Sequence, residues 1–167
     1  VMSFLMTATP LSMHVMENMS LKETGLVLQF HVVAMFLPSL ITGNLIKKYG
    51  HSAIIYGGVL FFFITVLISL FEQTYLNYML SLIFLGLGWN FLFISGTSLV
   101  VLTYNKEEKF KVQGINDLIV FSTMALASLS AGILLNSIGW KMMNIICIPF
   151  LILIILVSFV ADKKSAS

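Results

Sequence analysis

The chain has 167 residues, of which 59% are hydrophobic and only 10% are charged, and its formal net charge is +2. Soluble domains carry about 25% charged residues, so this composition excludes an ordinary soluble enzyme or binding module and indicates a membrane protein. The basic residues are all lysines and form no stripe, which excludes a nucleic-acid-binding surface. A single cysteine, Cys147, excludes a disulfide framework.

Apolar runs that approach the roughly 20 residues needed to cross a bilayer follow one another along the chain. We expect five complete spans, at residues 25–46, 53–71, 75–103, 115–138 and 142–161. The opening residues 1–16 are apolar too, but they are too short for a span and run into polar residues. We interpret them as the end of one further helix that exits into water.

An internal repeat supports this interpretation. The run 42–50 resembles the run 131–139, which lies 89 residues later. Three glycines match at that offset, Gly25, Gly43 and Gly50 with Gly114, Gly132 and Gly139. Only the first copy carries lysines, as is typical of two copies that cross a membrane in opposite directions. The offset aligns Val1 with Asn90, in the middle of a span, so we expect roughly 15 residues of a first helix before Val1.

These observations predict an all-α membrane protein with six transmembrane helices arranged as a 3+3 inverted repeat. We expect one bundle over residues 1–167. Its first three-helix repeat covers 1–71, with the first helix truncated, and its second covers 75–161.

The lysines predict the orientation. Seven lie in the connections after alternate helices and in the tail, at Lys47, Lys48, Lys106, Lys109, Lys111, Lys163 and Lys164. The opposite side has only Lys22 and Lys141. Because cytoplasmic loops are enriched in basic residues, the lysine-rich side and the C-terminus are predicted to be cytoplasmic.

Polar residues near the middle of the span 75–103 are candidates for a substrate pathway. Asn90 lies beside Trp89, and Thr97 shares its helical stripe with Phe93. A stripe of polar and aromatic side chains can line a cavity. The alternative for Asn90, which we weigh equally, is a hydrogen bond to a neighbouring helix.

Gln29 and His31 lie in the outer half of the span 25–46 and are further pathway candidates. Two residues apart on a helix, they point in nearly opposite directions, so both cannot face one cavity. An imidazole inside a membrane could carry a proton. A neutral His31 hydrogen-bonded to a neighbouring helix is the alternative. Pro38, in the same span, predicts a kink.

A candidate gate lies at the predicted cytoplasmic side. It comprises the loop residues Gly43, Lys47, Lys48 and Gly50, together with Asn116 and Asp117 at the start of the span 115–138. The structural interpretation of the loop is that its glycines permit close approach and a tight turn, while its lysines fix topology. The functional interpretation is a latch: Asp117 either caps its own helix or pairs with a lysine across the inner gate.

The pattern Gly43-x-Leu45-x-Lys47-Lys48-x-Gly50 resembles the loop signature of the major facilitator superfamily, between the second and third helices of a half. The resemblance covers essentially the whole chain. It implies the C-terminal half of a twelve-helix transporter, each half of which is a 3+3 inverted repeat. This chain has Lys47 where the family often has an acidic residue.

The expected function is therefore secondary active transport of a small solute by alternating access, in a bacterial cytoplasmic membrane. The expected partners are a missing N-terminal six-helix half, in the same chain or as a second copy, the small-molecule substrate and the lipid bilayer, with a coupling proton or ion left open. No cofactor, metal or nucleic acid is expected. The alternatives are a non-transporting scaffold or subunit, and an intramembrane enzyme, for which no nucleophile–base or metal-ligand pattern is present.

Overall fold

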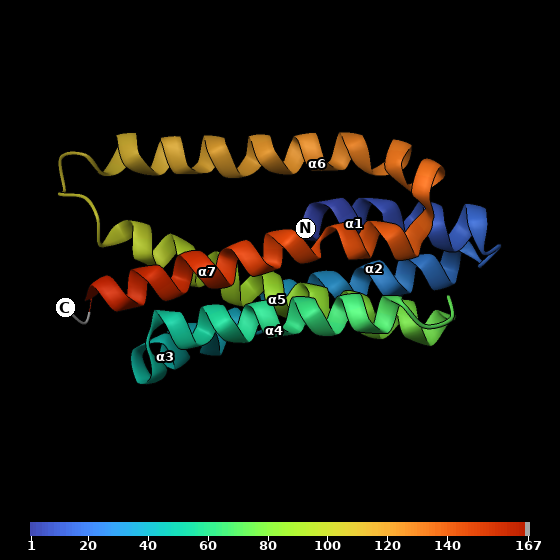
Figure 1. The fold of residues 1–167 in the computed structure, drawn as a ribbon, viewed down its shortest axis with the longest axis horizontal. Helices are drawn as coiled ribbons and strands as arrows, with labels where there is room; N and C mark the ends of the chain where they lie inside the picture. The colour runs from blue at the N-terminus through green and yellow to red at the C-terminus, as the bar shows by residue number, and fades with distance from the viewer. Residues whose placement is uncertain (166–167) are drawn as a thin grey trace.

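The structure is a computed structural model that describes residues 1–165, and every regular element in that range is a helix (Figure 1). The last two residues of the predicted bundle 1–167 lie outside the described residues. The elements are α1 (Met2–Pro10), the π-helical turn η1 (Leu11–Met16), α2 (Leu21–Phe36), α3 (Ser39–Tyr49), α4 (His51–Ser69), α5 (Tyr75–Val101), α6 (Lys109–Ile146) and α7 (Ile148–Ser165). The predicted all-α class is confirmed.

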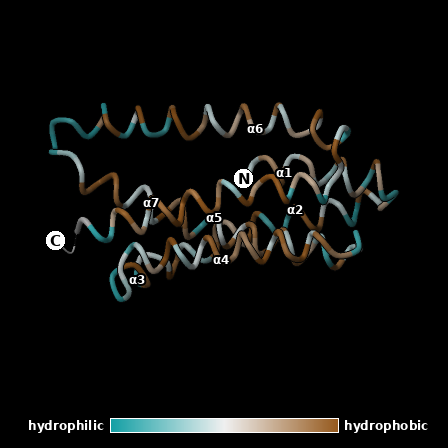
Figure 2. The backbone as a smooth tube through the Cα atoms, viewed as in Figure 1, coloured by the Kyte–Doolittle hydropathy of each residue, from teal (hydrophilic) through white to brown (hydrophobic). Residues whose placement is uncertain are grey.

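Several elements are long and apolar enough to cross a membrane. They are α4, α5 and the continuous stretch Lys109–Lys163, and α2 with α3 makes a further span that is bent by 41°. The long stretch is itself divided at Gly139, whose φ of 74° interrupts the helical conformation. Figure 2 shows hydrophobic residues along the length of the helices and hydrophilic residues gathered at the two ends of the bundle.

The bend between α2 and α3 lies at Pro38, where the sequence predicts a kink. Proline has no backbone N–H and its ring clashes with the preceding turn, so the regular hydrogen bonding of the helix stops there. Val33 still accepts the ordinary helical bond from the Leu37 N–H, whereas the Phe36 carbonyl accepts from the Ser39 hydroxyl. A new helix then starts, with the Thr42 N–H bonded to the Pro38 carbonyl.

Glycines bring α5 close to two neighbours. A Cβ built on Gly86 would lie 2.7 Å from the His31 carbonyl oxygen in α2, and one built on Gly88 would lie 2.5 Å from the Phe62 ring in α4. Small residues let helix backbones approach closely in a membrane. Gly43 makes no such approach within the described residues, because a Cβ added there would meet none of their atoms within 4 Å.

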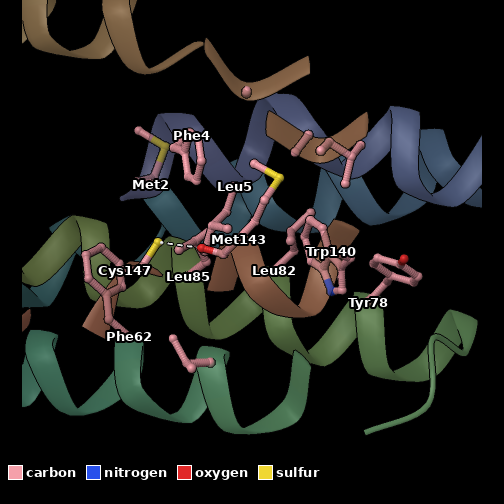
Figure 3. Close-up of a cluster of buried hydrophobic side chains, with 14 of the residues drawn as sticks. Met2, Phe4, Leu5, Phe62, Tyr78, Leu82, Leu85, Trp140, Met143 and Cys147 are labelled. Atoms are coloured by element: carbon pink, nitrogen blue, oxygen red, sulfur yellow. Dashed lines mark hydrogen bonds between the residues drawn. The ribbon is translucent and has the colours of Figure 1, made fainter. Parts of the chain in front are cut away.

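The first helix of each predicted repeat packs against the second helix of the other repeat. The first helix of one repeat, α1, packs against α6, while the corresponding helix of the other repeat, α5, packs against α2. The core between them is apolar, and Figure 3 shows Leu82, Leu85 and Met143 among its side chains. Cys147 is buried there, with its thiol donating to the Met143 carbonyl, as expected of a small apolar residue.

Candidate functional site

A cavity of about 390 Å³ lies on the side of α5 that carries Trp89, Phe93 and Thr97. The rings of Trp89 and Phe93 stack, with 4.8 Å between their centroids and 22° between their planes. They are four residues apart on one helix, so they lie one above the other on the same face. Together they form an aromatic wall of the cavity.

Polar groups reach the same cavity from two helices. Thr97 comes from α5, and Asn116 comes from the first third of α6. Val1 and Met2, at the start of α1, line another side of the cavity. Of the residues predicted for the substrate pathway, Trp89 and Thr97 therefore line one cavity. Asn116, which the sequence assigned to the gate, joins them.

Asn90 does not line this cavity. Its side chain is 3% exposed and points to the bend between α2 and α3. Its Nδ2 donates to the Met35 carbonyl oxygen at 2.7 Å, and its Oδ1 accepts from the Thr42 hydroxyl at 2.7 Å. Of the two interpretations that the sequence left open, this geometry corresponds to the hydrogen bond between helices.

His31 and Gln29 lie on different sides of α2, as their spacing predicts. His31 is fully buried against α5, and its Nδ1 lies 2.7 Å from the Leu82 carbonyl oxygen. A carbonyl can only accept, so Nδ1 carries the proton in this contact. Among the described residues, Nε2 has no hydrogen-bond partner. Gln29 is exposed on the opposite side.

The gate loop lies at the end of α3. Lys47 and Lys48 are exposed, with the Lys48 ammonium 4.9 Å from the centre of the Tyr49 ring. Gly50 ends the helix with φ at 84°, a conformation that only glycine adopts readily. The tight turn that the sequence predicts at Gly50 is confirmed.

The interpretation of Asp117 as a helix cap is wrong. The helix begins at Lys109, two turns before Asp117, and not near 115 as the apolar pattern predicted. A helix dipole acts within the first turn, so it gives Asp117 little stabilisation. The side chain is exposed and accepts from the Asn116 amide at 3.2 Å. Figure 1 places this part of α6 on the opposite side of the bundle from α3, so the structure does not bring Asp117 to Lys47 or Lys48.

Sequence reasoning missed a polar cluster at the same end of the bundle. The Asp162 carboxylate in α7 accepts from the hydroxyls of Ser52 and Tyr56 in α4, the latter at 3.1 Å. His51 Nε2 lies 3.0 Å from the Ser98 hydroxyl in α5. The available signal was an acidic residue at the very end of the last apolar run, next to Lys163.

Comparison with known proteins agrees with the resemblance found in the sequence. Residues 1–167 match the family model described as the Major Facilitator Superfamily. The chain is 40% identical over 154 residues to the riboflavin transporter RfnT of Brucella anthropi, which covers 92% of this chain and 38% of that protein. It is 32% identical over 148 residues to YdeG of Bacillus subtilis, an uncharacterised MFS-type transporter, covering 87% of this chain and 34% of that protein. No solved structure matches the chain significantly. The chain thus spans little more than a third of these curated relatives.

Proposed function

Because this chain belongs to the major facilitator superfamily, we propose that it is the C-terminal six-helix half of a secondary active transporter that moves a small solute by alternating access. The family and the apolar helices identify a multi-pass membrane protein, and they point to transport and not to enzymatic chemistry. The orientation that we propose, with the C-terminus in the cytoplasm of a bacterium, rests on the distribution of lysines.

The 3+3 arrangement is part of this proposal. Packing supports it: α1 lies on α6 while α5 lies on α2, which is the exchange expected when two three-helix repeats are related by a two-fold axis. The break at Gly139 separates the last two of the six proposed spans. The turn at Gly50 separates the corresponding spans of the first repeat.

A second six-helix unit, in the same polypeptide or in a second copy, would complete the transporter. The lengths of the relatives support it, since this chain matches little more than a third of each. Gln29 supports it as well: this polar side chain is exposed on a face of α2 that also carries the exposed side chains of Val33 and Phe36. An amide is costly to expose to lipid, and contact with a partner bundle or a water-filled pathway removes that cost.

The cavity beside Trp89 and Phe93 is the observation that carries the substrate proposal. A stacked aromatic pair with two polar neighbours, Thr97 and Asn116, suits a planar aromatic solute that also carries hydrogen-bonding groups. Riboflavin, the compound in the name of the 40% identical relative, has this chemistry. We therefore propose riboflavin or a similar flavin as the solute.

The test uses the protein as expressed from its own gene, in cells that need external riboflavin. We expect flavin-dependent growth and uptake, and quenching of flavin fluorescence by the purified protein. Phe93→Leu should weaken binding about 5- to 30-fold, the range expected when an aromatic contact worth roughly 1–2 kcal/mol is lost. The matched control is Phe110→Leu, the same substitution at a side chain that is 85% exposed and outside the cavity.

The outcomes separate the parts of the proposal. If growth and uptake occur but Phe93→Leu has no effect on them, the cavity is not part of the substrate pathway. If the protein transports no flavin, flavins are not its substrates. The scaffold alternative is tested by Thr97→Cys in a Cys147→Ala background: labelling from both sides of the membrane supports alternating access, whereas a site sealed from both sides supports a scaffold.

A further inference from the structure

Asn90 joins α5 to both parts of the bent span. Its amide nitrogen donates to Met35 in the last turn of α2, and its amide oxygen accepts from Thr42 in the first turns of α3. The Thr42 hydroxyl also lies 2.8 Å from the carbonyl oxygen of Pro38, the residue at the bend. One buried side chain thus contacts the helix before the bend, and through Thr42 the helix after it.

The bond to Met35 distinguishes a bent span from a straight one. In an unbroken helix the Met35 carbonyl would accept the Ser39 N–H, four residues later. Here it accepts the Asn90 amide instead. Burial strengthens the preference, because a carbonyl that loses its partner inside a protein costs the full desolvation penalty. The Asn90 side chain therefore stabilises the bent form at the expense of the straight one.

The other half of the repeat has a matched contact. Met124, at the same repeat position as Met35, accepts from the Ser3 hydroxyl of α1 at 3.0 Å. Ser3 also bonds to Ser128, which in turn accepts from the Thr7 hydroxyl at 3.1 Å. The corresponding part of α6 has no proline and is a continuous helix, so this contact holds a straight span.

We propose that Asn90 and Thr42 form a latch that selects the bent conformation of α2–α3, and that opening the latch lets α3 realign with α2. The latch then sets where the end of α3, with the Lys47–Lys48 loop, lies relative to α5. This role does not depend on which solute is transported. In this role Asn90 positions a helix and does not contact the substrate.

Spin-label distances measure the bend directly. Labels on cysteines placed at Leu21 and Lys48, both exposed, report the length of the whole span in the full-length protein in liposomes, in a Cys147→Ala background. Two helical segments that meet at 41° are shorter end to end than one straight helix, here by about 2–3 Å at a rise of 1.5 Å per residue.

The informative background is Pro38→Ala, which removes the steric cause of the bend and leaves the latch. We expect Pro38→Ala alone to keep the shorter distance. Adding Asn90→Leu or Thr42→Val should lower the ratio of bent to straight populations about 3- to 20-fold, the range that measured interhelical hydrogen bonds in membranes imply. Thr42→Val is nearly isosteric, which guards against misfolding.

The matched control is Thr123→Val. Within the described part of the chain the Thr123 hydroxyl bonds only to the Ile119 carbonyl of its own helix, at 2.7 Å, so its loss should leave the distance unchanged. Two results would overturn the latch. Either Pro38→Ala alone straightens the span, which assigns the bend to the proline ring, or the combined variants keep the bend, which shows that Asn90 and Thr42 do not hold it.

Discussion

Gly50 and Gly139, which lie 89 residues apart, share one backbone conformation. Their φ and ψ angles are 84° and 164° in the first case and 74° and 170° in the second. This region of φ/ψ space is essentially restricted to glycine. Each residue interrupts a pair of helices at the same position of the sequence repeat, so the repeat detected in the sequence recurs in the backbone.

A side chain at either glycine should destabilise the fold through the backbone alone. An added Cβ at Gly139 would meet no atom within 4 Å, so the cost comes from the dihedral angles and not from a clash. We expect Gly139→Ala and Gly50→Ala each to lower the free energy of unfolding by about 1–3 kcal/mol. Thermal unfolding in detergent measures it.

The control for these substitutions is Gly114→Ala, at a glycine inside α6 with equal space around it. Alanine favours a helix by about 1 kcal/mol relative to glycine, so this variant should be as stable as the parent or more stable. An equal loss at Gly114 and Gly139 would show that the special conformation is not the cause.

Gly86 should be intolerant of a side chain for the opposite reason, contact. A Cβ at Gly86 would lie 2.7 Å from a carbonyl oxygen of α2 and 2.9 Å from the Ala34 methyl, and a backbone atom cannot rotate away. Gly86→Ala should therefore separate α5 from α2, with a cost of about 1–3 kcal/mol, visible as a lower unfolding temperature. Gly96→Ala, ten residues along the same helix and with no atom of the described residues within 4 Å of the added Cβ, should be as stable as the parent or more stable.

Asp117 is exposed on the described bundle, next to Asn116 at the cavity. If it pairs with a cation of a partner bundle in one access state, Asp117→Asn should shift the ratio of inside to outside labelling at Thr97→Cys. We expect about a 3- to 10-fold change, as the loss of a partly exposed ion pair of roughly 1 kcal/mol implies. The idea fails if neither labelling nor transport changes. Glu107→Gln, a carboxylate in the preceding loop, serves as the control.

The start of α2 should respond to acid. Ser20 and Glu23 form a capping box, in which the Ser20 hydroxyl and backbone N–H both donate to the Glu23 carboxylate. These hydrogen bonds lower the pKa of Glu23. Because the folded pKa lies below the unfolded one, the stabilisation is present above the ordinary pKa of a glutamate. It is lost as the pH falls through the lowered value.

The measurement is the unfolding temperature between pH 7 and about pH 3, where carboxylates titrate. The parent protein should lose stability on acidification more steeply than Glu23→Gln, which lacks the titrating group but keeps the side-chain length. Glu72→Gln, at an exposed carboxylate in the loop after α4, should follow the parent. Parallel curves for the parent and Glu23→Gln would contradict the assignment.

Much of the fold follows from local features of the sequence. The spans expected at 53–71 and 75–103 correspond to α4 and α5, with ends that differ by at most two residues. The geometry of proline and glycine predicts where the kink at Pro38 and the turn at Gly50 lie. The start of α6 was missed because its first turns, from Lys109, carry polar residues that hydropathy assigns to a loop.

The candidate site was less predictable. The sequence singles out Trp89 and Thr97, because polar and aromatic residues stand out in an apolar helix, and in the structure both line one cavity. That Asn116 joins them could not be read from the sequence, because α5 and α6 meet only through the tertiary fold. Asn90 was identified as important, but both of its roles required a polar side chain at mid-helix, so the residue type could not choose between them.

The sequence by itself determined the membrane class, the positions of most spans and the glycine turns, because hydropathy and backbone angles are local properties. Only the tertiary structure decided which helix each side chain faces. In a soluble protein, apolar periodicity marks the buried face, but a membrane helix is apolar all round, so the pattern does not distinguish lipid from neighbour. The contacts of His31 with Leu82, and of Asn90 with the bend at Pro38, therefore appear only when the helices are packed.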